Sequence, residues 1–202
     1  LCRKPRCLHP GLLDSQCRVT VVIWRRDSAN KGLCISCKNF RKLKAVGSRE
    51  IPRVVAGAKS NELGHPVLLD PVGAGASALR TNTAVEIMEK IKLDVIRGNI
   101  SEIKTLALGS GTTKGVDADA ADTVTEDNLD QMVAFAKSFA AKSGAVVAIT
   151  GAIDLVADAE KCYVIRNGRP EMSRITGTGC QLSGIATAYA VANPDSKTEA
   201  VA

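Results

Sequence analysis

Three short strand-like runs, each ending in a turn or a polar residue, most restrict the fold that this chain can adopt. They are Pro66–Asp70, Asp94–Arg97 and Ala145–Thr150, and segments with helical spacing stand between them. Runs of this length with apolar centres are typical of strands buried in a parallel sheet. The alternation predicts an α/β fold with a mostly parallel central sheet, helices on both faces and ligands at the carboxyl ends of the strands.

The segments between these runs carry helix signals. Residues 54–63 have the pattern of a helix that Gly64 closes, and residues around 77–91 should form another, for which Thr83 and Glu86 offer a capping box. Further expected elements are a helix from about Ser101, an amphipathic helix over 129–140 and antiparallel strands over 154–158 and 161–165.

The composition of the chain changes near residue 53. Residues 1–53 hold 13 Lys and Arg against three Asp and Glu, a net charge of +10, whereas residues 54–202 carry a net charge of −4. Five of the seven cysteines lie in the first 37 residues, and this part shows no clear period apart from a possible strand over 19–24. We therefore expect residues 1–53 to be a basic, Cys-rich segment outside the fold, such as an altered reading frame or a misjoined piece, and residues 54–202 to form the domain.

Two functions remain open for the first segment. Cys34 and Cys37, with Cys17, Cys7 and His9, could form a zinc site, and the basic excess could contact nucleic acid, although the second metal-ligand pair is not closely spaced. We expect neither zinc nor a nucleic-acid partner. An odd number of cysteines and no apolar signal or membrane-length run indicate a soluble protein of a reducing, cytoplasmic compartment without a membrane partner.

The turn Thr176-Gly177-Thr178-Gly179-Cys180 runs directly into a small, apolar, helix-forming stretch. Glycines allow close backbone approach, and the first turn of a helix presents unpaired N–H groups and the positive end of the helix dipole. Gly177, Thr178, Gly179 and Cys180 therefore predict an anion hole, in which Cys180 could act as a base or nucleophile. An ordinary loop-to-helix junction with a buried cysteine remains the alternative.

Four polar residues lie at the ends of the expected strands or shortly after them. Asp70 precedes an open proline-glycine turn, Arg97 could bind phosphate oxygens, Glu102 comes one helical turn later, and Thr150 offers a hydroxyl. Two carboxylates near a phosphate site suit Mg²⁺. Each also has a plain structural explanation: a surface Asp, a capped helix start with a solvated Arg–Glu pair, or turn chemistry. Their repetition at successive strand ends favours nucleotide chemistry.

In this order the motifs resemble those of the hydroxyethylthiazole kinase family, a branch of the ribokinase-like fold, over about residues 54–202. They are Pro66–Gly75, Val95–Glu102, Lys114–Asp117, Val147–Gly151 and Ile175–Ser183. The resemblance implies phosphorylation of the alcohol of 4-methyl-5-(2-hydroxyethyl)thiazole by ATP with Mg²⁺, in thiamine salvage. It also implies a homotrimer. The family's N-terminal segment is not matched in residues 1–53, and members continue past Ala202, so the domain is expected to be truncated at both ends.

The resemblance also assigns residues. It makes Arg97 and Thr150 contacts to ATP, Asp70 and Glu102 the residues that organise Mg²⁺, Gly177 a backbone contact to the thiazole alcohol and Cys180 the counterpart of an aspartate base. Two alternatives stay open: a related kinase, such as a hydroxymethylpyrimidine kinase, against which the cysteine argues, and a non-catalytic piece that retains only nucleotide binding.

Overall fold

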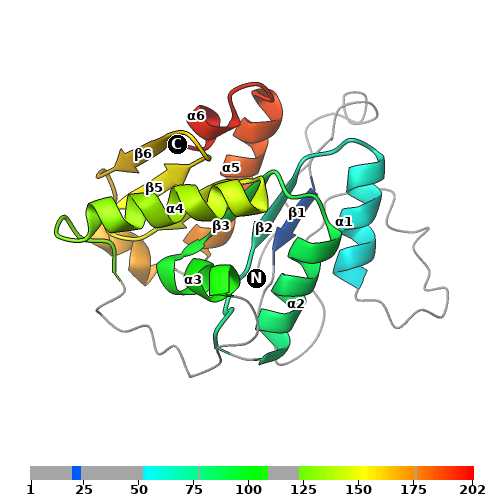
Figure 1. Ribbon diagram of the computed structural model, residues 1–202, viewed down its shortest axis with the longest axis horizontal. Coiled ribbons are helices and arrows are strands. Elements are labelled where there is room, and N and C mark those ends of the chain that lie inside the picture. Colours follow the sequence, from blue (N-terminus) through cyan, green and yellow to red (C-terminus); the bar gives the residue numbers. More distant parts are fainter. Residues whose placement is uncertain (1–19, 24–51, 77, 109–122, 176) are drawn as a thin grey trace.

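In the described part of the chain, six strands lie in one sheet, in the order in which they occur in the sequence (Figure 1). The computed structural model describes residues 20–23, 52–76, 78–108, 123–175 and 177–202. The strands are β1 (Thr20–Ile23), β2 (Val67–Asp70), β3 (Val95–Asn99), β4 (Val146–Thr150), β5 (Asp154–Ala157) and β6 (Cys162–Ile165). Strands β1 to β4 pair in parallel, and β5 and β6 extend the sheet in antiparallel fashion. The predicted mostly parallel sheet is confirmed.

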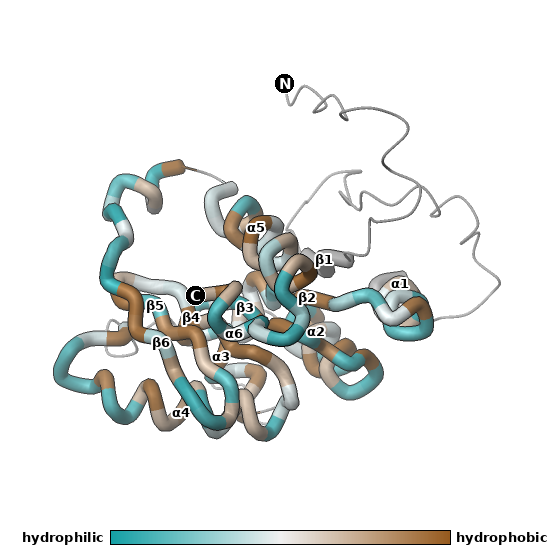
Figure 2. Tube along the Cα trace, turned by 90° about the horizontal axis from the view of Figure 1, so that it is seen from above, coloured by the Kyte–Doolittle hydropathy of each residue, from teal (hydrophilic) through white to brown (hydrophobic). Residues whose placement is uncertain are grey.

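Helices cover both faces of the sheet, as predicted. The helices are α1 (Pro52–Glu62), α2 (Ala78–Lys90), α3 (Ile100–Leu108), α4 (Leu129–Ser143), a 3-10 helix η3 (Pro170–Arg174), α5 (Thr178–Ala192) and α6 (Lys197–Val201). Helices α1 to α4 pack on one face, where most of the buried apolar side chains lie, and α5 packs on the other. Figure 2 shows α4 and α5 on opposite sides of the strands.

Alternation along the strands divides the core between these two layers. In β2, Val67 and Leu69 face the cluster under α1 to α4, whereas Leu68 faces Ala186 and Ala190 of α5. This is the period of two that a strand requires when both of its faces are buried. All of β2 is buried. Most of β3 and β4 is buried too, although the last residue of β3 is exposed and that of β4 is partly buried.

The capping box predicted from Thr83 and Glu86 is wrong. Helix α2 already begins at Ala78, so Thr83 lies inside the helix, where its hydroxyl donates to the carbonyl oxygen of Leu79 at 2.7 Å. A threonine can satisfy its hydroxyl in this way within a helix, so the capping signature is not specific to a helix start. The predicted closing role of Gly64 fits its left-handed φ of 67° and its position just after α1.

Four residues of the segment expected to lie outside the fold, Thr20–Ile23, form β1 and pair in parallel with β2. The family motif at 114–117, Thr176 and the cysteines and histidine of the zinc hypothesis lie outside the described residues, so those predictions remain predictions. In the part of the chain that the structure describes, no helix has the length and apolar character needed to cross a membrane.

Candidate active site

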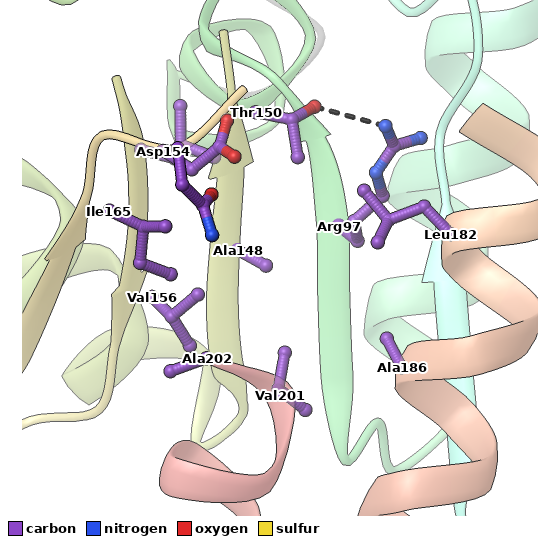
Figure 3. Close-up of a pocket in the computed structure, with 12 residues that line it drawn as sticks. Arg97, Ala148, Thr150, Asp154, Val156, Ile165, Leu182, Ala186, Val201 and Ala202 are labelled. Atoms are coloured by element: carbon purple, nitrogen blue, oxygen red, sulfur yellow. Dashed lines mark hydrogen bonds between the residues drawn. The ribbon is translucent and has the colours of Figure 1, made fainter. Parts of the chain in front are cut away.

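The carboxyl ends of β2, β3 and β4 bring together three of the predicted residues. Arg97 Nη1 donates to Asp70 Oδ2 at 3.2 Å. Arg97 Nη2 donates to Thr150 Oγ1 at 3.0 Å, and Figure 3 shows this second hydrogen bond. Because the parallel strands end at the same edge of the sheet, residues far apart in sequence meet there. One guanidinium thus joins the ends of three neighbouring strands.

The Arg97–Asp70 ion pair is buried. The side chain of Arg97 is 13% exposed and that of Asp70 is 1% exposed. Burial raises the pKa of Asp70, while the hydrogen bond from Ser183 and the charge of Arg97 oppose that rise. Arg97 Nε and Asp70 Oδ1 are buried and have no hydrogen-bond partner among the described residues. Buried polar atoms of this kind normally have a partner, so the pair retains capacity for a ligand or ion.

The first turn of α5 lies against this pair. Gly177 caps the helix with a left-handed φ of 97°, a conformation that glycine adopts without strain. A Cβ atom on Gly179 would lie 3.1 Å from Arg97 Nη1, so glycine at this position allows the guanidinium to approach the helix backbone. The predicted anion hole over 177–180 therefore occupies a helix N-terminus next to a buried cation.

Cys180 also lies in the first turn of α5. Its side chain is a free thiol and is partly buried. Its position, two residues after the start of the helix, is the one that the sequence predicted.

Glu102 connects the turn after β2 with the start of α3. Its Oε1 accepts the Gly73 N–H at 2.7 Å and its Oε2 accepts the Asn99 N–H at 3.0 Å, while Asn99 Oδ1 accepts the Glu102 N–H at 2.8 Å. Burial raises the pKa of Glu102, these two N–H groups oppose the rise, and the charge of Asp70 adds to it. The helix start is capped, but the ion-pair partner of Arg97 is Asp70 rather than Glu102.

Two carboxylates near one another can contribute to a Mg²⁺ site. Asp70 Oδ2 is engaged by two donors whereas Oδ1 has none, and each oxygen of Glu102 accepts one N–H and keeps a further lone pair. Among the described residues no group of three or more His, Cys, Asp and Glu side chains could hold a metal. Mg²⁺ takes one or two carboxylates and completes its shell with water and substrate phosphates, so Asp70 and Glu102 could contribute to such a site.

Ser183 belongs to this cluster, although sequence reasoning did not assign it a role. It is fully buried on α5, and its hydroxyl lies 2.7 Å from Asp70 Oδ2 and 3.1 Å from the Gly179 carbonyl oxygen. The signal that could have found it is spacing, because residues four apart on a helix share a face. Spacing places Ser183 on the face of Gly179, but the sheet residue that it meets is decided by how α5 packs.

A pocket of about 170 Å³ opens beside the cluster on the α5 side of the sheet. Figure 3 shows the Arg97–Thr150 hydrogen bond at one end of it. Asp154 and Val156 of β5 and Leu182 and Ala186 of α5 line its walls. The pocket thus has a polar end, where Arg97, Thr150 and Asp154 lie, and largely apolar walls away from it.

Comparison with known proteins identifies the family of the chain. The model of the hydroxyethylthiazole kinase family matches residues 46–202. A hydroxyethylthiazole kinase from Clostridium acetobutylicum is 61% identical over 145 residues, which are 72% of this chain and 53% of that protein. The enzyme of the same name from Ruminiclostridium cellulolyticum is 45% identical over 149 residues, 74% of this chain and 53% of that protein. The chain spans about half the length of these curated relatives.

Two solved structures show the same fold. The structure of a hydroxyethylthiazole kinase from Pyrococcus horikoshii superimposes with a TM-score of 0.59 at 29% identity, covering 77% of this chain and 57% of that one. Pyridoxal kinase of Bacillus subtilis, solved as an ADP complex, gives a TM-score of 0.50 at 24% identity, over 76% of this chain and 57% of that one. The fold is therefore ribokinase-like, and the chain belongs to the hydroxyethylthiazole kinase family.

Proposed function

We propose that the chain provides a phosphoryl-transfer site that uses ATP and Mg²⁺ to phosphorylate the hydroxyl of hydroxyethylthiazole. The observation that carries this proposal is the Arg97 guanidinium, which lies at the meeting point of three strand ends and the first turn of α5. Phosphoryl transfer needs positioning and charge stabilisation more than covalent chemistry. A buried guanidinium beside a helix N-terminus supplies both.

Arg97 and Thr150 are the proposed contacts to the phosphates of ATP. The guanidinium has a buried Nε–H without a partner among the described residues, and the Thr150 hydroxyl lies at the polar end of the pocket. The N–H groups of 177–180 would receive the transferred phosphoryl group, because the charge of its equatorial oxygens must be stabilised.

Cys180 and Gly177 are proposed to act on the alcohol. The substrate oxygen forms a bond to the γ-phosphorus while the bond from that phosphorus to the bridging oxygen of ADP breaks. Cys180 is proposed to orient the hydroxyl or, as a thiolate, to accept its proton, and the backbone of Gly177 holds the alcohol end. Cys180 occupies the first turn of α5, among the residues whose N–H groups would receive the transferred phosphoryl group.

Asp70 and Glu102 are the residues that would hold Mg²⁺. When bound, the ion neutralises charge on the ATP phosphates. Independently of the ion, Glu102 fixes the turn after β2 through Gly73, and Asp70 fixes Arg97. These contacts keep the phosphate-binding groups in place before ATP arrives.

The test is to incubate the chain with Mg-ATP and hydroxyethylthiazole and to detect the phosphorylated thiazole by mass spectrometry. Hydroxymethylpyrimidine serves as the competing alcohol. We expect product from the thiazole, and none from Arg97→Ala or Cys180→Ala. Arg166→Ala is the matched control, since that arginine pairs with Glu126 in an exposed ion pair, and it should retain activity.

A thermal-shift titration separates the enzyme from a piece that binds nucleotide only. Stabilisation by Mg-ATP and by the thiazole in separate titrations supports the enzyme, because a ligand of the native state raises the melting temperature. Stabilisation by Mg-ATP alone supports nucleotide binding without catalysis. A folded chain that responds to neither compound and forms no product contradicts the proposal.

A further inference from the structure

We propose that Ser183 is a positioning residue that sets the Asp70–Arg97 pair against the first turn of α5. The inference rests on the proposed function and adds a residue to the same site. Ser183 is fully buried, and its hydroxyl is the contact by which α5 holds the carboxylate of Asp70.

The hydroxyl has one proton and two acceptors within reach. Asp70 Oδ2 lies at 2.7 Å and the Gly179 carbonyl oxygen at 3.1 Å. Hydrogen bonds to an ionised acceptor are shorter and stronger than those to a neutral one. The Ser183 proton therefore goes to Asp70 when that carboxyl is ionised.

This hydrogen bond fixes the rotation of the Asp70 carboxylate. Oδ2 receives one donor from Ser183 of α5 and another from Arg97 of β3, whereas Oδ1 is left without a partner among the described residues. The terminal torsion of an aspartate is soft. Without the Ser183 hydroxyl, the longer contact to Arg97, at 3.2 Å, would alone hold the carboxylate.

The contacts of Ser183 also connect the helix with the guanidinium. Ser183 reaches Asp70, Asp70 pairs with Arg97, and Arg97 lies against Gly179, one turn before Ser183 on the same helix. These four residues form a closed ring of contacts. The ring fixes how far the cation lies from the N–H groups of the anion hole, the spacing on which recognition of phosphate depends.

Thr187 provides a matched control. It lies on α5 four residues after Ser183, is 2% exposed, and donates its hydroxyl to the Ser183 carbonyl oxygen at 2.6 Å. Both hydroxyls are therefore buried and lie within hydrogen-bond distance of a helix carbonyl, but only that of Ser183 has a hydrogen bond to Asp70 among those found in the structure. Thr187→Val and Ser183→Ala each remove one such hydroxyl with little change of shape.

The experiment measures the Kd of Mg-ATP by calorimetry, the KM of ATP and kcat, and the melting temperature, for the wild-type chain and both variants. Both variants should melt at lower temperature. Only Ser183→Ala should raise the Kd and KM, by about tenfold, because a hydrogen bond to a charged group is worth at least one decade in an equilibrium constant. Thr187→Val should stay within about twofold of the wild type.

Ser183→Cys is a second variant, and it replaces Ser183→Ala in the experiment if the alanine variant does not fold. It keeps a side chain of similar shape but offers only a weak S–H donor, so the same rise in Kd is expected. A Kd that changes no more in the Ser183 variants than in Thr187→Val overturns the positioning role alone. A folded wild-type chain that neither binds Mg-ATP nor makes product overturns the proposed function, and the positioning role with it.

Discussion

Arg97 donates to Asp70 at 3.2 Å across the ends of two neighbouring strands, and both side chains are largely withdrawn from water. A buried pair of this kind is costly to desolvate and is a weak source of stability. It does place a fixed cation at the end of the sheet, where the helix α5 begins. Ligand binding therefore explains the pair better than folding does.

Replacing Arg97 with lysine should impair the site although the charge is kept. A guanidinium can donate to Asp70 and Thr150 at once, whereas an ammonium group is a compact point charge without this planar fork. We expect kcat/KM for ATP to fall by roughly 10- to 100-fold, as for the loss of a hydrogen bond to a charged group. Steady-state kinetics checks this. A value within about twofold of the wild type would show that the fork geometry is unimportant.

Gly179→Ala should weaken ATP binding, because the added Cβ would lie 3.1 Å from Arg97 Nη1 and push the guanidinium away. We expect the Kd of Mg-ATP to rise by about tenfold or more, the size of one lost charge-assisted contact. Calorimetry gives the value.

Gly184→Ala on the same helix is the control. Its Cβ would meet nothing within 4 Å, and alanine is better than glycine in a helix by about 1 kcal/mol. This variant should therefore gain stability and keep its Kd. Equal Kd values for the two alanine variants would exclude a role for the close approach at Gly179.

Glu102→Gln should lower both stability and the response to Mg²⁺. The carboxylate accepts N–H groups from Gly73 and Asn99, whereas a glutamine amide has one acceptor oxygen. One N–H would lose its partner, at a cost of about 1–3 kcal/mol in the free energy of unfolding. Urea unfolding measures this loss. The Mg²⁺ concentration that gives half-maximal activity should also be higher in the variant. Glu89→Gln, at an exposed position of α2, should change neither quantity.

The free energy of unfolding should depend on pH through Asp70, in the direction set by the raised pKa of its carboxyl. Burial raises the pKa of Asp70 above its ordinary value of 3.8, against the opposing effects of Ser183 and Arg97. Between the unfolded and folded pKa values the native state binds more protons, so stability falls as pH rises through this interval and is level above it. Asp70→Asn lacks this titration.

The free energy of unfolding of the wild type minus that of Asp70→Asn should therefore decrease from about pH 4 upward, starting near the ordinary pKa of an aspartate. Urea unfolding of both proteins at several pH values gives the difference. An increase with pH would mean that the attraction of Arg97 outweighs burial and that the pKa of Asp70 is lowered.

The sequence predicted the parts of the fold that depend on local pattern. The runs ending at Asp70, Arg97 and Thr150 are strands, and the glycine turn at 177–179 begins a helix. Because parallel strands end at a common edge, those residues could be expected to meet. The family motifs then supplied roles that no single residue could show by itself.

Contacts that depend on the packing of the elements could not be predicted in this way. Thr83 resembles a helix cap in sequence, but it lies inside α2, whose start at Ala78 agrees with the helix expected over about 77–91. Arg97 and Glu102 suggested an ion pair within one segment of the chain, yet the buried partner of Arg97 comes from the neighbouring strand β2. Ser183 contacts Asp70 across 113 residues of sequence, a relationship that only the packing of α5 on the sheet establishes.

The most direct test of the central claim, that Arg97 and the first turn of α5 form an ATP phosphate site, is calorimetry of Mg-ATP binding to the wild-type chain and to Arg97→Ala. We predict a single site in the wild type and a loss of at least about 100-fold in affinity in the variant, the size expected when a charged contact is removed from a desolvated site. Equal affinities in two folded proteins, or no binding to a folded wild type, would contradict the account.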